Sequence, residues 1–538
     1  MSVSIYSEIR KAFRETNELP YIFQPLSEAG KYEVNRLLWK EDCLNNEEKE
    51  RLAYKTIKKI KSHIEGNKKD ISLLIYMKEF PLCDYMSQFT DLLRPHIDYG
   101  YFDADEIYNF AIRLTTQSIY DSLVKLGILI LGNFENDYTK KVMMILGYHS
   151  EFTMYVIEAS YRFSDYYKIV EELLRNTDGY GKLCSAIKYR PVTIEQKKYI
   201  SEEIIEDVLF TKRELSLYIV TNTLLKDYFD EIEITKVNFR SLSTLIAYSF
   251  YEASFKEFSI SKNLVEKYIF SANRYANNYI DLAAILIIKS GLEKTLGDDD
   301  KPSLRNGWNV EIEESIVKSC NIVLEKFDLE KKIIEELSEN IYFNIEDASL
   351  MMFILKEYQY YFDKTVDESV FRAIFDAVPF YFDLIEYFLV ENGSKYYRTV
   401  YDVLEEKLPE EVLNSYRSVK EADIEYLPDV WLVYLLENLK LMGEYKEEFF
   451  IKCLFARFKD VRMKSVTVLK HFKDSWSKKV VESLEEAKAG EPDKDISNFI
   501  KIMLEEFDFE NLKRQEKSPD EENTKKIIKL EFENGENK

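Results

Sequence analysis

The chain has 538 residues, a formal net charge of −23, and only 15 glycines and 11 prolines. Average proteins contain about 7% glycine and 5% proline, so this shortage favours helices joined by short turns and leaves little material for glycine-rich phosphate loops. The excess of acidic residues repels phosphate groups, which makes nucleic acids and anionic membranes poor partners. The expected partner is therefore a protein or a small apolar molecule.

Neither the N-terminus nor any apolar run suggests a membrane protein. The first twenty residues lack the apolar core of a signal peptide. The longest apolar runs, 126–131 and 280–288, are much shorter than the roughly 18 to 20 residues that span a bilayer. The cysteines stand far apart at Cys43, Cys83, Cys184, Cys320 and Cys453. This scatter favours reduced thiols, so we expect a soluble, cytoplasmic protein without a transmembrane segment.

Helical periodicity begins after a lead segment, residues 1–30, and continues with few interruptions. Apolar residues at helical spacing predict a helix that Asn46 caps and Gly66 ends. Two prolines, Pro81 and Pro95, are expected to break the helical segment that follows.

The next helix is expected to begin at Asp103 or Asp105. Residues 122–159 then form a helix, a turn and a second helix, close to the roughly 40-residue unit of HEAT-like repeats. We assign residues 31–296 to an N-terminal helical-repeat lobe.

A polar stretch, residues 297–309, predicts a loop between two lobes. The C-terminal helical-repeat lobe would cover residues 310–486, and a linker with a last helix would cover 487–512. Residues 513–538 are rich in charge and poor in aromatic residues, which is typical of a disordered tail.

One motif in the C-terminal lobe indicates how these helices pack. The sequence KDVRMKSVTVLKHF, residues 459–472, resembles the second helix of a HEAT repeat. In such a helix Asp460 would cap the start, Val461 would face the core, and Arg462 would reach a neighbouring turn. The sequence therefore predicts an all-α fold, a HEAT- or armadillo-like α-solenoid of short antiparallel helix pairs. An irregular helical bundle has the same periodicity and remains the alternative.

Few residues suggest catalysis. The chain has 4 histidines and no pair of them has a metal-ligand spacing, so no metal site is predicted. The best candidates, both weak, are His96 and Asp98 in a tyrosine-rich stretch. The stretch Asp178–Ala186 resembles a phosphate loop only faintly, and Asp298–Asp300 lacks the spacing of a calcium loop. Catalytic and cofactor-binding residues cannot be assigned, and no cofactor motif is evident.

Aromatic residues are abundant, with 39 tyrosines and 34 phenylalanines. Most are expected to form a helical core. The alternative is a tyrosine-lined concave face that binds peptides or apolar small molecules.

Several stretches resemble a bacterial family carried under the name limonene hydroxylase. They are Leu19–Phe89, Leu92–Phe102 and Leu131–Ser160, so the resemblance covers mainly the first 160 residues. It implies a monooxygenase that uses O₂ and NAD(P)H to convert limonene, a monoterpene, to perillyl alcohol or carveol. It also implies an alcohol dehydrogenase activity that oxidises the alcohol further.

Two hypotheses about function follow. The family resemblance predicts an oxidoreductase that acts on a monoterpene. The residues themselves favour a non-catalytic helical-repeat scaffold that binds a protein partner, because they provide no haem-thiolate loop, iron triad or dinucleotide fingerprint.

Overall fold

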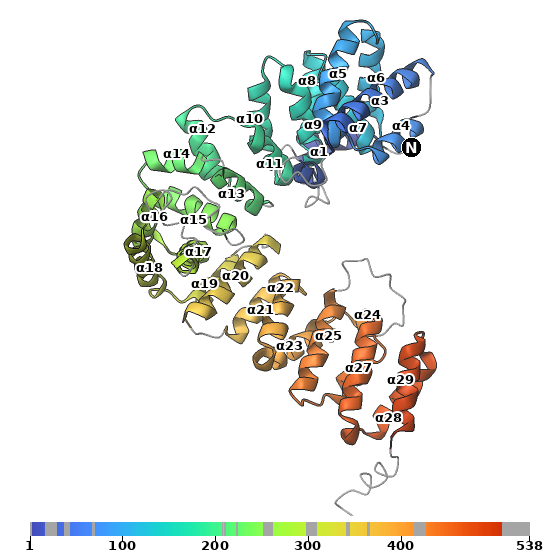
Figure 1. Cartoon of the computed structure of the whole chain (residues 1–538), viewed down its shortest axis with the longest axis vertical. Coiled ribbons are helices and arrows are strands. Elements are labelled where there is room, and N and C mark those ends of the chain that lie inside the picture. The colour runs from blue at the N-terminus through green and yellow to red at the C-terminus, as the bar shows by residue number, and fades with distance from the viewer. Residues whose placement is uncertain are drawn as a thin grey trace, which may run out of the picture. The chain divides into compact units, whose positions relative to one another are not determined.

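The computed structural model contains helices and no strand among the residues that it describes, so the all-α prediction is confirmed (Figure 1). The described residues are 3–16, 29–36, 44–66, 70–206, 208, 211–221, 224–250, 262–296, 309–339, 345–362, 366–413 and 427–507. Contacts divide the chain into two compact units, Met1–Lys332 and Ile333–Lys538. The division falls within α19 (Leu329–Glu339).

The first unit contains helices α1 to α18. Their bounds are α1 Ile5–Thr16, α2 Lys31–Val34, α3 Asn46–Glu65, α4 Ile71–Glu79, α5 Met86–Asp98, α6 Ala104–Gln117, α7 Asp121–Leu131, α8 Asp137–Gly147, α9 Ser150–Ala159, α10 Tyr166–Asn176, α11 Gly179–Lys188, α12 Ile194–Lys198, α13 Lys212–Thr221, α14 Leu224–Glu231, α15 Lys236–Phe250, α16 Lys262–Tyr275, α17 Tyr279–Leu296 and α18 Val310–Leu324. Short 3₁₀ or π segments occur at η2 Leu82–Tyr85, η3 Ser160–Arg162 and η4 Tyr199–Glu203.

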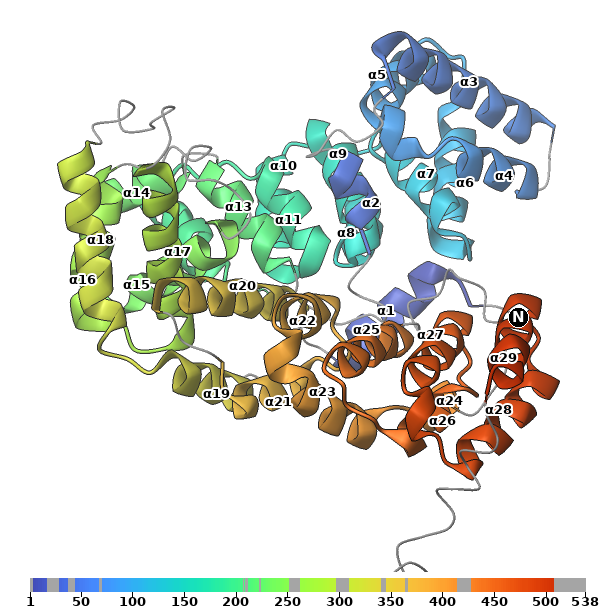
Figure 2. The ribbon, with the colours of Figure 1, turned by 60° about the horizontal axis from the view of Figure 1, so that its bottom comes forward.

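The second unit continues with α20 to α29. Their bounds are α20 Ile345–Phe362, α21 Glu368–Ala377, α22 Phe382–Ile385, α23 Gly393–Lys407, α24 Glu410–Leu413, α25 Leu427–Leu441, α26 Glu447–Cys453, α27 Lys459–His471, α28 Lys478–Gly490 and α29 Lys494–Glu505. A π segment, η7 Glu386–Glu391, and a 3₁₀ turn, η9 Lys473–Ser475, complete the unit. In Figure 2, α27 lies between α25 and α29, and it contacts both helices.

The lead segment, residues 1–30, contains a helix that the sequence analysis did not predict. Tyr6 and Ile9 of α1 lie on one side of the helix and are buried, and α1 contacts α6 and α8. The Ile5 amide also donates a hydrogen bond to the Ser118 carbonyl at 3.1 Å. The apolar stripe of α1 is only about three turns long, and the helices that it packs against lie about a hundred residues away in the sequence. A helix this short depends on such contacts, so local periodicity alone did not predict it.

Most predicted helix ends lie within a residue of the observed ones. The side chain of Asn45, rather than Asn46, accepts the capping hydrogen bond from the Glu48 amide. Gly66 ends that helix, and Asp103 caps the start of α6. Pro95 does not break α5, because it lies in the last turn, where the helix can lose one hydrogen bond and still continue.

Many helices of the first unit contact both the next helix and the helix two positions further along the chain. One series runs α7, α9, α11, α13, α15 and α17, each in contact with the next. In a second series α8 contacts α10. Further along the chain, α12, α14, α16 and α18 each contact the next helix of this series. The apolar run 126–131 belongs to α7 and is completely buried against such neighbours.

The predicted loop 297–309 does not separate the two units. The helices on either side of it, α17 and α18, pack against each other within the first unit, and the loop itself lies outside the described residues except for Asn309. The predicted linker near residue 490 is a short turn between α28 and α29, which contact each other. The predicted last helix is confirmed as α29, and the predicted disordered tail lies outside the described residues.

The motif that begins at Asp460 forms the first turn of α27. Val461 is fully buried, as predicted. Arg462 donates through both Nε and Nη2 to the Glu491 carboxylate at 2.8 Å, and its Nη1 donates to the Ala456 and Arg457 carbonyls at 2.9 Å. The expected reach of this arginine to a neighbouring turn is thus observed.

The expected role of Asp460 is wrong. The N-cap of α27 is Phe458, and no side chain caps the helix by a hydrogen bond. Asp460 lies one residue inside the helix and is exposed to solvent. Its carboxylate can interact favourably with the helix dipole there, but it replaces no missing backbone partner.

A second arginine fork, which the sequence analysis did not single out, lies just before α27, where the partly buried Arg457 meets a buried carboxylate. Arg457 binds Asp429 of α25 through Nε at 3.1 Å and Nη2 at 2.8 Å, and its amide donates to the Val412 carbonyl of α24 at 2.9 Å. These bonds join α24, α25 and the segment that leads into α27. Arginine forks therefore connect successive helices of the second unit.

Candidate functional site

The residues proposed from the sequence, His96 and Asp98, both lie in α5 but serve different partners. The Nδ1 of His96 donates to the Leu92 carbonyl at 2.7 Å, and its ring packs edge-on against Tyr101. Asp98 accepts from the Nε of Arg94 at 2.9 Å. The partners of both side chains belong to α5 or to the residues just after it. His96 and Asp98 therefore stabilise the end of this helix.

The cysteines of the described residues are free thiols with raised pKa values. Burial raises the pKa of Cys184, Cys320 and Cys453. For Cys83, burial and the nearby Glu33 and Asp84 carboxylates act in the same direction. A thiol whose pKa is raised is a weak nucleophile at neutral pH, in line with structural thiols. Cys43 lies outside the described residues.

The faint phosphate-loop resemblance at Asp178–Ala186 has a packing explanation. Gly181 belongs to α11, and a Cβ at this position would lie 2.8 Å from the Thr153 Oγ1 and 2.9 Å from the Ser150 Oγ. The glycine therefore allows α11 to approach α9 closely, which explains Gly181 by helix packing. The acidic stretch Asp298–Asp300 lies outside the described residues.

A pocket with a volume of about 450 Å³ lies in the first unit. It lies among α2, the end of α4, η2, α7 and α9. Its lining residues are Tyr32, Glu33, Met77, Lys78, Pro81, Leu82, Asp121, Ser122, Lys125, Glu151 and Tyr155. Charged and aromatic side chains thus share this pocket.

Gly30 holds one wall of the pocket in place. Its φ of 81° lies in the left-handed region that favours glycine, and a Cβ would lie 2.7 Å from the Ser150 carbonyl oxygen. Its amide donates to Oε2 of Glu151 at 3.2 Å. This close approach brings α2 against the start of α9 and buries Glu33.

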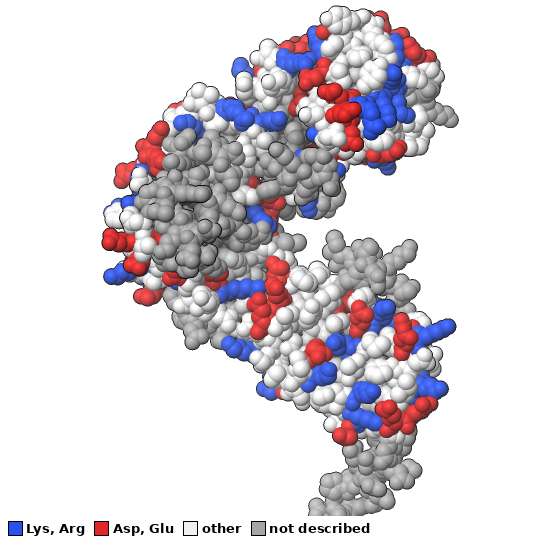
Figure 3. Space-filling view, viewed as in Figure 1, with Lys and Arg blue, Asp and Glu red and all other residues white. Residues whose placement is uncertain are grey.

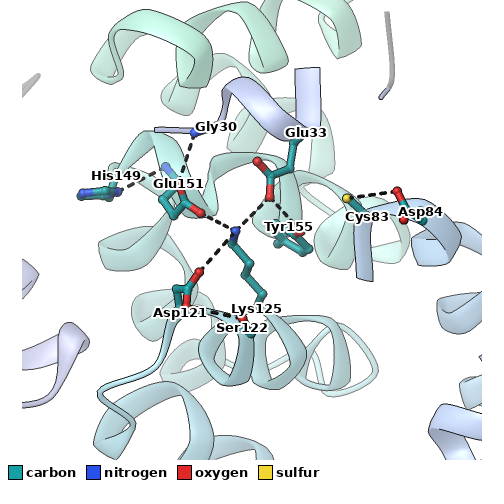
Figure 4. A network of polar contacts seen from close by, with 10 residues as sticks. All are labelled: Gly30, Glu33, Cys83, Asp84, Asp121, Ser122, Lys125, His149, Glu151 and Tyr155. Atoms are coloured by element: carbon teal, nitrogen blue, oxygen red, sulfur yellow. Dashed lines mark hydrogen bonds and ion pairs between the residues drawn. The ribbon is translucent and has the colours of Figure 1, made fainter. Parts of the chain in front are cut away.

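Lys125 lies at the centre of the polar network (Figure 4). Its Nζ donates to Glu33 Oε1 at 2.9 Å, and it also donates to Glu151 Oε1. Asp121 lies one helical turn earlier, and its Oδ2 is 3.9 Å from the Lys125 Nζ. The Tyr155 hydroxyl donates to the same Glu33 oxygen at 2.9 Å. The side chains of Lys125 and Glu33 are only 11% and 3% exposed, so their charges neutralise each other largely without water.

The network keeps Lys125 protonated. Burial alone would lower the pKa of Lys125, but the Glu33 and Glu151 carboxylates raise it overall. Burial raises the pKa of Glu151, while Lys125 opposes this effect. A lysine in this state cannot act as a nucleophile or form a Schiff base at neutral pH, because those roles require the free amine.

His149 precedes α9 and responds to the same lysine. Its Nδ1 accepts a hydrogen bond from the Glu151 amide at 3.2 Å, which requires that this nitrogen carry no proton. Burial, and then the positive charge of Lys125, lowers the pKa of His149 to about 4. The ring is therefore neutral at physiological pH and acts as a helix cap.

The pocket suits a polar ligand better than a hydrocarbon. Three carboxylates, from Glu33, Asp121 and Glu151, lie within 4 Å of the Lys125 Nζ, and Lys78 also lines the pocket. A terpene forms no hydrogen bonds, so it could not replace the water that these groups lose on binding. The pocket can bind or orient a polar group of a ligand. Lys125 cannot act as a general base there, because it is protonated.

The sequence analysis missed Lys125, Glu33 and Glu151 because they come from three separate elements. One local signal existed. Lys125 is the only charged residue between Ser122 and Leu131, a segment that is otherwise almost entirely apolar. A lone cation in such a segment indicates a buried partner of opposite charge.

The described residues lack two further features, a cluster of metal ligands and a membrane-spanning helix. No group of three or more histidine, cysteine or acidic side chains is arranged to hold a metal ion there. None of the helices in that part of the chain is both long enough and apolar enough to cross a bilayer.

Comparison of the chain with protein-family models, with curated proteins and with solved structures finds no match.

Proposed function

We propose that this protein is a helical-repeat scaffold that binds a protein partner and has no catalytic activity of its own. The observation that carries the proposal is the order of helix contacts. In the first unit, the series from α7 to α17 joins each helix to the one two positions further on. The second unit has a corresponding series of α23, α25, α27 and α29. Stacked antiparallel helix pairs, as in HEAT and armadillo arrays, produce this order.

The two arginine forks support the same architecture. Arg462 joins α27 to Glu491 at the end of α28, and Arg457 joins the start of α27 to Asp429 of α25. Each fork links one helix pair to the next. A stack held in this way presents extended surfaces along its rows, which is how repeat proteins bind other proteins. The free, scattered thiols support a cytoplasmic location.

Two observations weigh against a limonene hydroxylase that uses NAD(P)H. The one glycine pair that resembles a nucleotide loop lies at the start of α11, and its second glycine, Gly181, packs against Ser150 and Thr153. The pocket beside Lys125 is lined by acidic and basic side chains, and Lys125 is held as a cation. These residues do not fit a dinucleotide or a hydrocarbon substrate, so we derive no reaction step through them.

The test measures turnover and binding on the same purified full-length protein. Limonene, NADH or NADPH, and air are supplied, and perillyl alcohol and carveol are measured by gas chromatography and mass spectrometry. We expect no product above a heat-denatured control.

In parallel, chemical cross-linking in the native cells, followed by mass spectrometry, should recover the same protein partner in independent preparations. Product formation that scales with protein concentration, or the absence of any reproducible partner, would contradict the proposal.

A further inference from the structure

Helix α3 carries an exposed basic face in a chain whose net charge is −23. The exposed cations are Arg51, Lys55, Lys58 and Lys59, which recur at helical spacing on one side. No acidic residue occurs between Arg51 and Ile64. Figure 3 shows Lys and Arg side chains gathered over this helix.

Two of these cations, Lys58 and Lys59, lie over aromatic rings. Lys58 Nζ lies 4.4 Å from the centre of the Tyr54 ring, and Lys59 Nζ lies 4.6 Å from that of Tyr76. Neither lysine forms an ion pair with a residue that the structure describes, whereas Lys61 pairs with Glu65 at 3.2 Å. An aromatic ring orients an ammonium group without cancelling its charge, so Lys58 and Lys59 remain able to attract an anion.

The basic face continues into an apolar surface on α4. A pocket of about 270 Å³ lies between the two helices, and Lys58, Lys59 and Leu73 are among its lining residues. Beside it, Ile71 and Ile75 of α4 are 50% and 61% exposed. They lie four residues apart, so both are on one side of the helix. Positive charge and exposed apolar side chains thus adjoin.

We propose that this face binds a short acidic segment of a partner protein, one that also carries apolar side chains. The inference rests on the proposed scaffold function and adds the chemistry of the partner. From Arg51 to Lys59 the helix rises about 12 Å, which an extended segment of about four residues covers. Acidic side chains would pair with the lysines, and an apolar side chain would cover Ile75.

A protein segment fits this face better than a nucleic acid does. The favourable charge is confined to one helix, and the negative charge of the whole chain would repel a longer phosphate backbone. Ile71 and Ile75 offer apolar area that a phosphate backbone cannot use, whereas leucine or phenylalanine side chains can.

The experiment measures binding of a fluorescein-labelled ten-residue peptide that repeats Glu-Glu-Leu, by fluorescence anisotropy on the full-length protein. The variant Lys58→Glu/Lys59→Glu should bind at least about tenfold more weakly, because attraction becomes repulsion. The matched control, Lys478→Glu/Lys501→Glu, changes the net charge equally at lysines that are 69% and 63% exposed. It should bind like the unmodified protein. Thermal melting checks that both variants are folded, and Lys58→Gln/Lys59→Gln replaces the reversal if that variant is unstable.

Added salt should weaken the peptide complex, because exposed charges are screened. Replacing leucine by serine in the peptide should weaken it further, because the apolar contact with Ile75 is lost. Duplex DNA and phosphatidylserine vesicles serve as competing probes.

Three results would overturn the inference: no binding of the peptide to the unmodified protein, equal losses in the two charge-reversal variants, or tighter binding of DNA or vesicles than of the peptide. If the cross-linked partner is still recovered from cells that express Lys58→Glu/Lys59→Glu, the scaffold function stands and only this face is wrong.

Discussion

The two units bury positive charge in different ways. In the second unit Arg462 pairs with Glu491 through a two-bond fork, and the two side chains are 4% and 1% exposed. In the first unit Lys125 is shared between Glu33 and Glu151 and borders a pocket of about 450 Å³.

The first arrangement is closed, because both charged side chains are almost completely buried. The second is open and has more carboxylates than cations, so solvent or a ligand can change its balance. We therefore expect the arginine fork to contribute chiefly to stability, and the lysine network to respond more strongly to pH.

Loss of the fork should have the largest effect. Substitution Arg462→Ala leaves the Glu491 carboxylate buried without its cation, which should lower the free energy of unfolding by about 3 to 5 kcal/mol. Urea denaturation measures the loss, and Arg462→Lys, which keeps the charge but not the fork, should recover only part of it. In a stack of repeats, hydrogen exchange should increase around α25 to α29 while the first unit keeps its protection. A loss below about 1 kcal/mol, or increased exchange in both units, would contradict this view.

Loss of Lys125 should have a smaller and pH-dependent effect. Substitution Lys125→Met removes the cation between Glu33 and Glu151, and we expect a loss of about 2 to 3 kcal/mol at neutral pH. The pKa of Glu151, already raised by burial, would rise further without the lysine. A carboxyl whose pKa is raised on folding stabilises the folded state at low pH and loses this contribution as the pH increases through the folded pKa.

The deficit of Lys125→Met should therefore shrink on acidification, as measured by urea denaturation at a series of pH values. Glu151→Gln in the same variant should remove much of the deficit. Asp121→Asn is the control, because Asp121 is half exposed and should change stability by less than about 0.5 kcal/mol. A deficit that is constant with pH would show that packing of the lysine, and not charge, stabilises this region.

His149 should produce a moderate effect in the acid range. Its pKa is lowered to about 4 in the folded protein, against about 6.5 when unfolded. The stability that this depression contributes is complete above pH 6.5 and is lost as the pH falls toward 4. Substitution His149→Gln should reduce the acid sensitivity in this range by about 2 kcal/mol. The pKa of Glu151 is raised, which is the opposite of the shift at His149. The free energy of unfolding of the variant is therefore compared with that of the unmodified protein at each pH. If the two proteins show the same dependence of stability on pH, His149 does not have this role.

Asp460→Ala should have the smallest effect. The carboxylate is exposed and forms no capping hydrogen bond, so only its interaction with the helix dipole is lost. We expect a decrease below about 0.5 kcal/mol in urea denaturation. A decrease near 1 kcal/mol, typical of a lost N-cap, would restore the expectation drawn from the sequence.

The sequence alone determined the helical class and several helix ends. Scarce glycine and proline, 3.6-residue periodicity and local caps such as Asp103 act over a few residues, so they can be read from a single segment. The burial of Val461 followed from the same periodicity. The reach of Arg462 was predicted in general terms, because a repeat motif implies a neighbouring turn.

Only the tertiary structure decided which charges meet. Glu33, Lys125 and Glu151 are separated by 92 and 26 positions, and nothing in the local pattern indicates their pairing. The partner of Arg462 is a glutamate 29 residues away rather than Asp460, two residues before it. Side chains pair according to the distances that helix packing creates, and packing depends on the complete fold. For this reason the sequence could predict the helices, while the pocket and its electrostatics came from the structure.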